Sequence, residues 1–142
     1  MMMKMVLAVA ALGGCAVAEV GAPPSTVRAA AGSTEEFKLD VADAAADWTA
    51  VGCPITYDPD DPEAIDVRRV LDWPEDSEEF SGHYYRFEGL ILIRAYSDDY
   101  WAWEYSTLRH EMGHMLRLPH TEAGIMAPVI ETLDVTAEDC AR

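Results

Sequence analysis

The apolar positions near the start of the chain recur at the spacing of a helix: Phe37, Val41, Ala45 and Trp48. Such a stripe is typical of a helix that packs on a core along one face. Ser33, with Glu36 three residues later, matches a capping box, and Gly52 stands where a helix would end. The pattern therefore predicts a helix over 34–51 with Ser33 as its N-cap.

Apolar residues in the middle of the chain follow the shorter period of strands. The segments that alternate or are continuously apolar are 55–57, 65–73, 83–87 and 90–96. The uninterrupted run over 90–93 is typical of a strand that is buried on both faces. Glu88 and Gly89 separate the last two segments and indicate a turn between paired strands.

Two further helices are predicted in the second half of the chain. The longer one begins between Asp98 and Ser106 and ends near Leu116. Its face toward the core is expected to hold Leu108, Met112, Met115 and Leu116. Thr136, with Asp139 three residues later, is the expected N-cap of a short C-terminal helix. The order helix, strands, helix, loop, helix is that of an α+β domain.

The N-terminal region is predicted to lie outside the folded domain. The chain has 142 residues, which is one domain by length. Residues 1–18 are interpreted as a signal peptide, because Lys4 precedes a short apolar run over 6–12 that cannot span a bilayer. Residues 19–32 are rich in Gly, Pro and Ala and are interpreted as a linker. The folded domain is therefore expected over 33–142.

Two cleavage sites compete at the end of the signal peptide. Residues 12–15, with the sequence LGGC, resemble a bacterial lipobox, in which Cys15 would be lipidated. Residues 16–18, with the sequence AVA, fit ordinary signal-peptidase cleavage. Either way the protein is expected outside the cytoplasm, secreted or lipid-anchored at the cell envelope. A lipid on Cys15 is the one membrane attachment that we expect.

The remaining cysteines form an even pair. Once Cys15 is lipidated or removed, Cys53 and Cys140 are left. Cysteines of exported proteins usually pair, because the compartment is oxidising. A Cys53–Cys140 disulfide is therefore predicted.

The chain is strongly acidic, with 26 Asp and Glu against 10 Lys and Arg and a formal net charge of −16. A nucleic-acid-binding surface is not expected, because neutralising phosphates requires clustered Lys and Arg. Carboxylates gather in the loop Asp58–Glu63, and calcium takes such ligands. The loop matches no calcium motif, and a solvated acidic loop is the other interpretation.

The most informative segment begins at His110, Glu111 and His114. Two histidines four positions apart lie on one helix face, about 6 Å apart along the axis. Their ring nitrogens can then bind one ion, and neutral imidazole suits zinc. Glu111 is rotated from His110 by about 100°. It therefore stands beside the ion, where a general base must be to take a proton from water.

His120 is the expected third ligand. Pro119 disfavours helix at Leu118, so the chain must leave the helix and double back toward the same ion. Three neutral ligands leave a fourth position open. Such an open position is typical of catalytic rather than structural zinc.

These residues resemble the metzincin clan of zinc peptidases, and within it the matrixin-like group. The clan's motif is H-E-x-x-H-x-x-G-x-x-H followed by a methionine turn. His110, Glu111, His114 and His120 match it, and 124–128, with the sequence GIMAP, looks like the methionine turn.

The resemblance implies a small zincin-like domain, with a mixed twisted sheet, an active-site helix and one catalytic zinc. It implies that Met126 lies beneath the zinc as a hydrophobic floor. It also implies a cleft between the sheet and the loop after the motif. A protein or peptide substrate would bind there in an extended conformation and pair with a sheet edge, which is β-augmentation.

The chain departs from the clan at three points. Arg117 replaces the motif's glycine, and a left-handed backbone at this residue would cost roughly 1–2 kcal/mol. We expect it to be strained, because the spacing from His114 to His120 leaves little slack; a differently built helix end is the alternative. Ala127 stands where many relatives carry Tyr. The domain is also short, which leaves open that an N-terminal strand is missing.

The sequence therefore predicts a zinc endopeptidase that hydrolyses peptide bonds by metal-activated water, with Glu111 as general base. The alternative is a zinc-binding or peptide-binding surface domain without turnover. The intact Glu111 argues against that alternative, because it has little to do in a purely structural zinc site. A zinc-scavenging protein would show His-rich tracts, whereas this chain has 4 His.

Overall fold

The computed structural model describes residues 21–73, 81–95, 102–128 and 134–141. The predicted signal peptide and Cys15 lie outside these ranges. The elements in chain order are β1 Thr26–Ala29, α2 Glu35–Ala50, β2 Thr56–Tyr57, β3 Ile65–Val70, β4 Gly82–Tyr85, β5 Leu90–Arg94, α3 Ala102–Met115 and α4 Ala137–Cys140. This is an α+β arrangement, as the sequence predicts.

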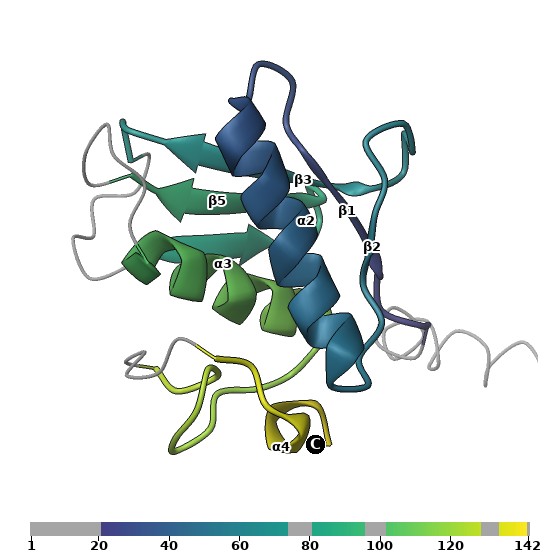
Figure 1. Cartoon of the computed structure of the whole chain (residues 1–142), viewed down its shortest axis with the longest axis vertical. Coiled ribbons are helices and arrows are strands. Elements are labelled where there is room, and N and C mark those ends of the chain that lie inside the picture. The colour runs from purple at the N-terminus through teal and green to yellow at the C-terminus, as the bar shows by residue number, and fades with distance from the viewer. Residues whose placement is uncertain (1–20, 74–80, 96–101, 129–133, 142) are drawn as a thin grey trace, which may run out of the picture.

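The strands form one mixed sheet in the order β2-β1-β3-β5-β4 (Figure 1). Neighbouring strands are parallel except β4, which runs antiparallel to β5 with Gly82 opposite Ile93. Glu88 and Gly89 lie in the turn of this hairpin, and Gly89 adopts the positive φ of 61° that such a tight turn favours. Strand β4 therefore forms one edge of the sheet.

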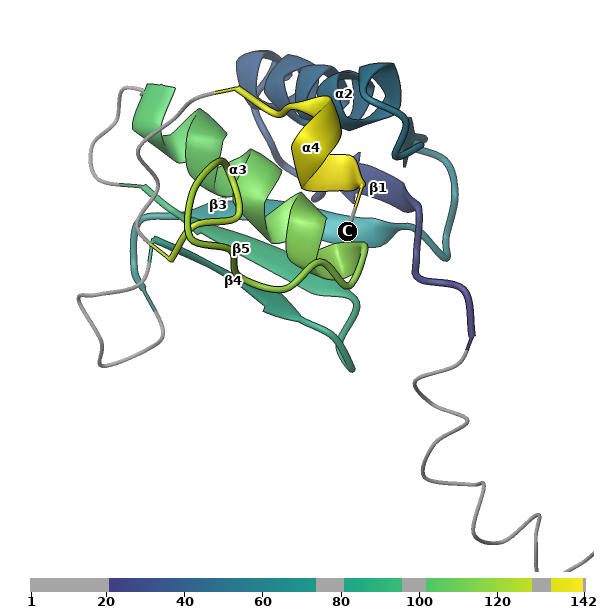
Figure 2. The same ribbon diagram turned by 90° about the horizontal axis from the view of Figure 1, so that it is seen from below.

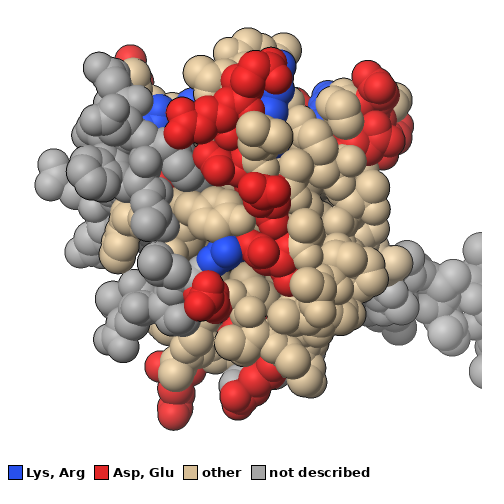
Figure 3. Space-filling view, in the orientation of Figure 1, with Lys and Arg blue, Asp and Glu red and all other residues tan. Residues whose placement is uncertain are grey.

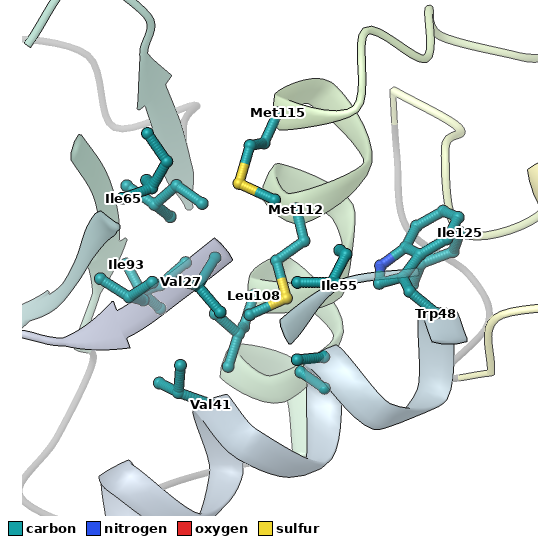
Figure 4. Packing of buried hydrophobic residues seen from close by; sticks show 14 of the residues in the cluster. Val27, Val41, Trp48, Ile55, Ile65, Ile93, Leu108, Met112, Met115 and Ile125 are labelled. Atoms are coloured by element: carbon teal, nitrogen blue, oxygen red, sulfur yellow. The ribbon is translucent and has the colours of Figure 1, made fainter. Parts of the chain in front are cut away.

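Both long helices pack on the same face of the sheet (Figure 2). Strand β3 alternates accordingly, since Ile65 and Val67 are buried whereas Arg68 is exposed. Helix α2 lies over β1 and β2, and α3 lies over β4 and β5. The core between helices and sheet is seen in Figure 4 and includes Val27, Val41, Trp48, Ile91, Ile93, Leu108, Met112 and Met115.

The linker prediction for 19–32 is wrong at β1. This strand lies inside the sheet, where it pairs with β2 on one side and β3 on the other, and Val27 is fully buried. It has four residues among Ala, Gly and Pro, too few to show a period of two. Its stability comes from partners that are distant in sequence. The folded domain thus begins before residue 33, and it includes an N-terminal strand.

Helix α2 begins one residue later than the capping pattern suggests. Oγ1 of Thr34 accepts the backbone N–H of Phe37 at 3.2 Å, so Thr34 is the N-cap. The hydroxyl of Ser33 instead donates to the carbonyl of Ala30 at 2.6 Å. That bond closes the turn between β1 and the helix.

The other predicted elements are confirmed within a few residues. Strand β3 ends at Val70 rather than Trp73, and α3 begins inside the predicted interval. Thr136 caps α4 in a reciprocal capping box with Asp139. None of the helices in the described ranges is long and apolar enough to cross a bilayer.

Among the charged side chains on the face shown in Figure 3, acidic ones prevail over basic ones. Those of α2 are Glu35, Glu36, Asp40, Asp43 and Asp47. Burial, together with the neighbouring charges of Glu36 and Asp43, raises the pKa of Asp40 above its ordinary value. The like charges on this helix therefore repel one another.

The predicted disulfide is present. Cys53 and Cys140 are bonded, with their Cα atoms 5.7 Å apart and a sequence separation of 87. The bond joins the chain just after α2 to the last residue of α4. It is thus the covalent link between the first helix and the C-terminal segment.

Removing this disulfide should destabilise the domain strongly. A Cys53→Ser/Cys140→Ser double variant is expected to lose up to about 4–5 kcal/mol, because the unfolded chain gains the entropy of a long open loop. Urea unfolding of both proteins measures the difference. Alkylation and mass measurement of unreduced protein produced in an oxidising compartment give the direct check, and two free thiols would contradict the assignment.

Candidate metal centre

Helix α3 presents two histidines on the side away from the core. Its opposite face holds Leu108, Met112 and Met115, all fully buried, and this burial sets the rotation of the helix. His110 and His114 lie one turn apart on the side opposite this face, with ring centroids 4.6 Å apart. His110 is buried and His114 half-buried.

The end of α3 reverses the chain through a Schellman motif. The N–H of Leu118 donates to the carbonyl of Gly113 at 3.0 Å, and that of Arg117 donates to His114 at 2.9 Å. Arg117 has φ 66°, the left-handed conformation expected where the motif has glycine. The predicted strain at Arg117 is therefore confirmed in its backbone. The reversal carries His120 back beside α3.

The three imidazoles meet at their Nε2 atoms. Nε2 of His120 lies 3.2 Å from that of His110 and 3.1 Å from that of His114. Nitrogens bound tetrahedrally to zinc at 2.0–2.1 Å are about 3.3 Å apart, close to these separations. One proton can bridge only two of the nitrogens, whereas a cation satisfies all three. This cluster can therefore hold a metal ion.

Backbone carbonyls orient two of the rings. Nδ1 of His110 donates to the carbonyl of Ile125 at 2.6 Å, and Nδ1 of His114 donates to that of Leu118 at 3.0 Å. A carbonyl only accepts, so each Nδ1 carries the proton and each Nε2 keeps its lone pair. Such hydrogen bonds commonly orient metal-binding histidines.

Burial also keeps these rings neutral. It lowers the pKa of His110 to about 4, although the hydrogen bond to Ile125 opposes the shift. Burial lowers the pKa of His114 as well, against the opposing hydrogen bond to Leu118. Neutral imidazole is the form that binds a metal.

Glu111 lies against the edge strand. Its side chain is buried and faces Gly82 of β4, where an added Cβ would stand 2.9 Å from Cγ and 3.1 Å from Oε1 of Glu111. The same Cβ would approach Cγ2 of Thr107 to 2.6 Å. Only glycine therefore allows α3 to sit this close to β4. The sequence reasoning missed Gly82; its one signal is a glycine at the start of an apolar segment.

Met126 packs against the last turn of α3. It is buried, and a Cβ at Gly113 would overlap its Sδ and lie 3.1 Å from Cζ2 of Trp48. The preceding carbonyl, that of Ile125, accepts from His110. The segment predicted as a methionine turn thus contacts the helix between the two histidines. Gly113, a second glycine that the sequence reasoning missed, makes this approach feasible.

Ion pairs of Arg109 and Glu104 anchor α3 to other segments of the domain. Nε of Arg109 lies 2.9 Å from Oδ2 of Asp47 on α2, and the hydroxyl of Tyr105 donates to the same oxygen at 2.8 Å. Burial raises the pKa of Tyr105 to about 12, so its hydroxyl stays protonated. In the first turn, Arg69 of β3 pairs through two nitrogens with the fully buried Glu104.

In the acidic loop Asp58–Glu63, carboxylate side chains accept backbone N–H groups of the loop itself. Oδ1 of Asp58 accepts the N–H of Asp60 at 3.0 Å, and Oδ1 of Asp61 accepts that of Glu63 at 2.8 Å. Among the residues that the structure describes, the histidine cluster is the one group of three metal-ligand side chains. The arrangement of this loop therefore lends the calcium expectation no support.

Comparisons of the chain with protein-family models, with curated proteins and with solved structures found no match. The interpretation of the site therefore depends on its own geometry.

Relieving the turn at Arg117 should stabilise the domain. Arg117→Gly is expected to raise the free energy of unfolding by about 0.5–1 kcal/mol, because glycine removes the left-handed strain while adding unfolded-state entropy. The melting temperature should rise by about 2–4 °C. Arg117→Ala keeps the strained backbone and loses the side chain's bond to the Gly21 carbonyl, so it should not exceed the wild type. An Arg117→Gly variant less stable than Arg117→Ala would contradict this account.

Proposed function

We propose that this chain is an exported zinc endopeptidase of metzincin type, with Glu111 as general base. The observation that carries the proposal is the meeting of three imidazoles at their Nε2 atoms. Glu111 follows the first of them on the same helix. A structural metal site has no use for a buried carboxylate in this position.

Zinc suits this donor set better than calcium or magnesium does. Three imidazole nitrogens favour a borderline ion, whereas calcium and magnesium take oxygen ligands. Two of the rings are already oriented by carbonyls, so little reorganisation is needed when the ion binds. When bound in such a site, zinc supplies a Lewis acid toward water and the scissile carbonyl.

Glu111 then performs the proton transfers. Its carboxylate takes a proton from the attacking water and passes it to the leaving amine as the peptide bond breaks. Its burial against Gly82 restricts the side chain to one region between α3 and β4. A general base works best when its position is restricted in this way, because proton transfer requires hydrogen-bond distance.

The edge strand β4 favours an extended peptide as substrate. Arg94 donates its N–H to Ser81 at 2.8 Å, which makes this residue pair a hydrogen-bonded one. Because such pairs alternate along antiparallel strands, the main-chain groups of Gly82 and Tyr84 face away from β5. No described strand pairs with that side of β4. A peptide added there would run past Glu111.

Export is supported by the bonded pair Cys53 and Cys140, since disulfides persist in oxidising compartments. The N-terminal targeting pattern agrees with that location. Lipidation at Cys15 and free secretion remain alternatives under this proposal.

One zinc per chain should depend on all three cluster histidines. His120→Ala is expected to lose zinc after dialysis, because two ligands bind far more weakly than three. Metal analysis of purified protein measures the content. His83→Ala is the matched control, since His83 lies on β4 outside the cluster, and it should keep one zinc. Full zinc content in His120→Ala would overturn the three-histidine assignment.

Glu111→Gln should retain zinc and the fold but lose cleavage of a denatured protein substrate. A loss of about 10²-fold or more is expected, because only the positioned base is removed. Glu122 is an exposed carboxylate in the loop after α3, so the control variant Glu122→Gln should cleave normally. A chelator should stop cleavage by the wild type. A wild type that binds zinc but cleaves nothing would favour a zinc-binding surface domain instead.

A further inference from the structure

Helix α4 packs against the loop that follows α3 although it is distant from this loop in sequence. Figures 1 and 2 place it next to the C-terminal halves of α2 and α3. Its contact with the loop after α3 is made by Asp139. A Cβ at Gly124 would come within 2.5 Å of Oδ1 of this residue. The carboxylate therefore lies directly over the backbone of Gly124.

The side chain of Asp139 is held firmly from its own helix. It is buried, and Oδ2 accepts both the N–H and the hydroxyl of Thr136 at 2.8 Å. Thr136 in turn accepts the N–H of Asp139. This capping box directs one carboxylate oxygen to the helix start and leaves the other facing Gly124.

Gly124 begins the turn that carries the site's supporting groups. It has φ 85°, and its carbonyl accepts the N–H of Ala127 at 3.1 Å. Inside this turn, the carbonyl of Ile125 holds Nδ1 of His110, and Met126 fills the space over Gly113. A continuous series of contacts thus runs from Asp139 through Gly124 to the first histidine.

The disulfide holds α4 in this place. Cys140 follows Asp139 directly and is bonded to Cys53 beyond the end of α2. A helix of four residues has no stability of its own, because helix nucleation is costly. Its position against the turn therefore depends on tertiary contacts, among them the covalent bond and the packing of Asp139.

We propose that Asp139 is a positioning residue for the metal centre and that the Cys53–Cys140 bond keeps it in place. The inference rests on the proposed function in one respect, namely that the histidine cluster binds zinc. Loosening the turn frees the carbonyl that orients His110, so the first ligand loses its fixed direction. Outer partners of metal ligands are typically worth about 10- to 100-fold in metal affinity.

The test compares Zn²⁺ affinity of the full chain in variants of two helix caps. Asp139→Ala should bind Zn²⁺ at least about tenfold more weakly in competition with a chromophoric chelator. Its Co²⁺-loaded form should also show an altered visible spectrum. Asp139→Asn, which keeps an acceptor for Thr136, should recover most of the affinity. Thr34→Ala removes the equivalent cap of α2, far from the metal centre, and should change the affinity less than twofold.

The outcomes separate this inference from the proposed function. Wild-type affinity in Asp139→Ala, or an equal loss in Thr34→Ala, would overturn the positioning role while leaving zinc binding intact. A wild type that binds no Zn²⁺ would overturn the proposed function, and this inference with it.

Amide exchange in the metal-free protein provides a second measurement, which does not require Asp139→Ala to fold. In the Cys53→Ser/Cys140→Ser variant, the Ala127 amide, which donates to Gly124, should lose protection at least tenfold more than the Ala30 amide, which donates to Val67 in the sheet. Zn²⁺ affinity of the same variant should also fall. Equal loss of protection at both amides would contradict the proposal.

Discussion

The burial of one face of α3 is the constraint on which the rest of the site depends. Leu108, Met112 and Met115 are fully buried between the helix and its neighbours, and each contributes roughly 1.5–3 kcal/mol by leaving water. The helix cannot rotate without exposing them. His110 and Glu111 are therefore fixed in direction, the first toward the following loop and the second, about 100° around the helix, toward β4.

The loop after α3 is held by its backbone hydrogen bonds and by Leu118, Ile125 and Met126, which join the main core. Two carbonyls of this loop, those of Leu118 and Ile125, also accept from the histidine rings of α3. The loop conformation and the ligand orientation are thus fixed together. This coupling gives a physical reason for a left-handed arginine at 117: a relaxed backbone there would move His120 away from the other two rings.

Glycines allow the backbone to approach side chains closely at three places around the site. Gly82 admits Glu111, Gly113 admits Met126, and Gly124 admits Asp139. In each case a methyl group would force two elements apart by displacing a side chain that belongs to the centre or supports it. A small domain with a thin core can hold three histidines in register in this way, because the supporting contacts are short and made by several separate segments.

The sequence by itself determined what depends on local spacing. The interval between His110 and His114, the proline before His120, the left-handed Arg117 and the cap at Thr136 are all set within a few residues, and the cysteine pairing followed from parity. Tertiary structure alone decided β1, whose four residues are stabilised by strands on both sides, and the contacts of Gly82 and Gly124. These contacts join segments that are distant in the chain. A local hydrophobic period does not indicate which distant segment a strand or a glycine will contact.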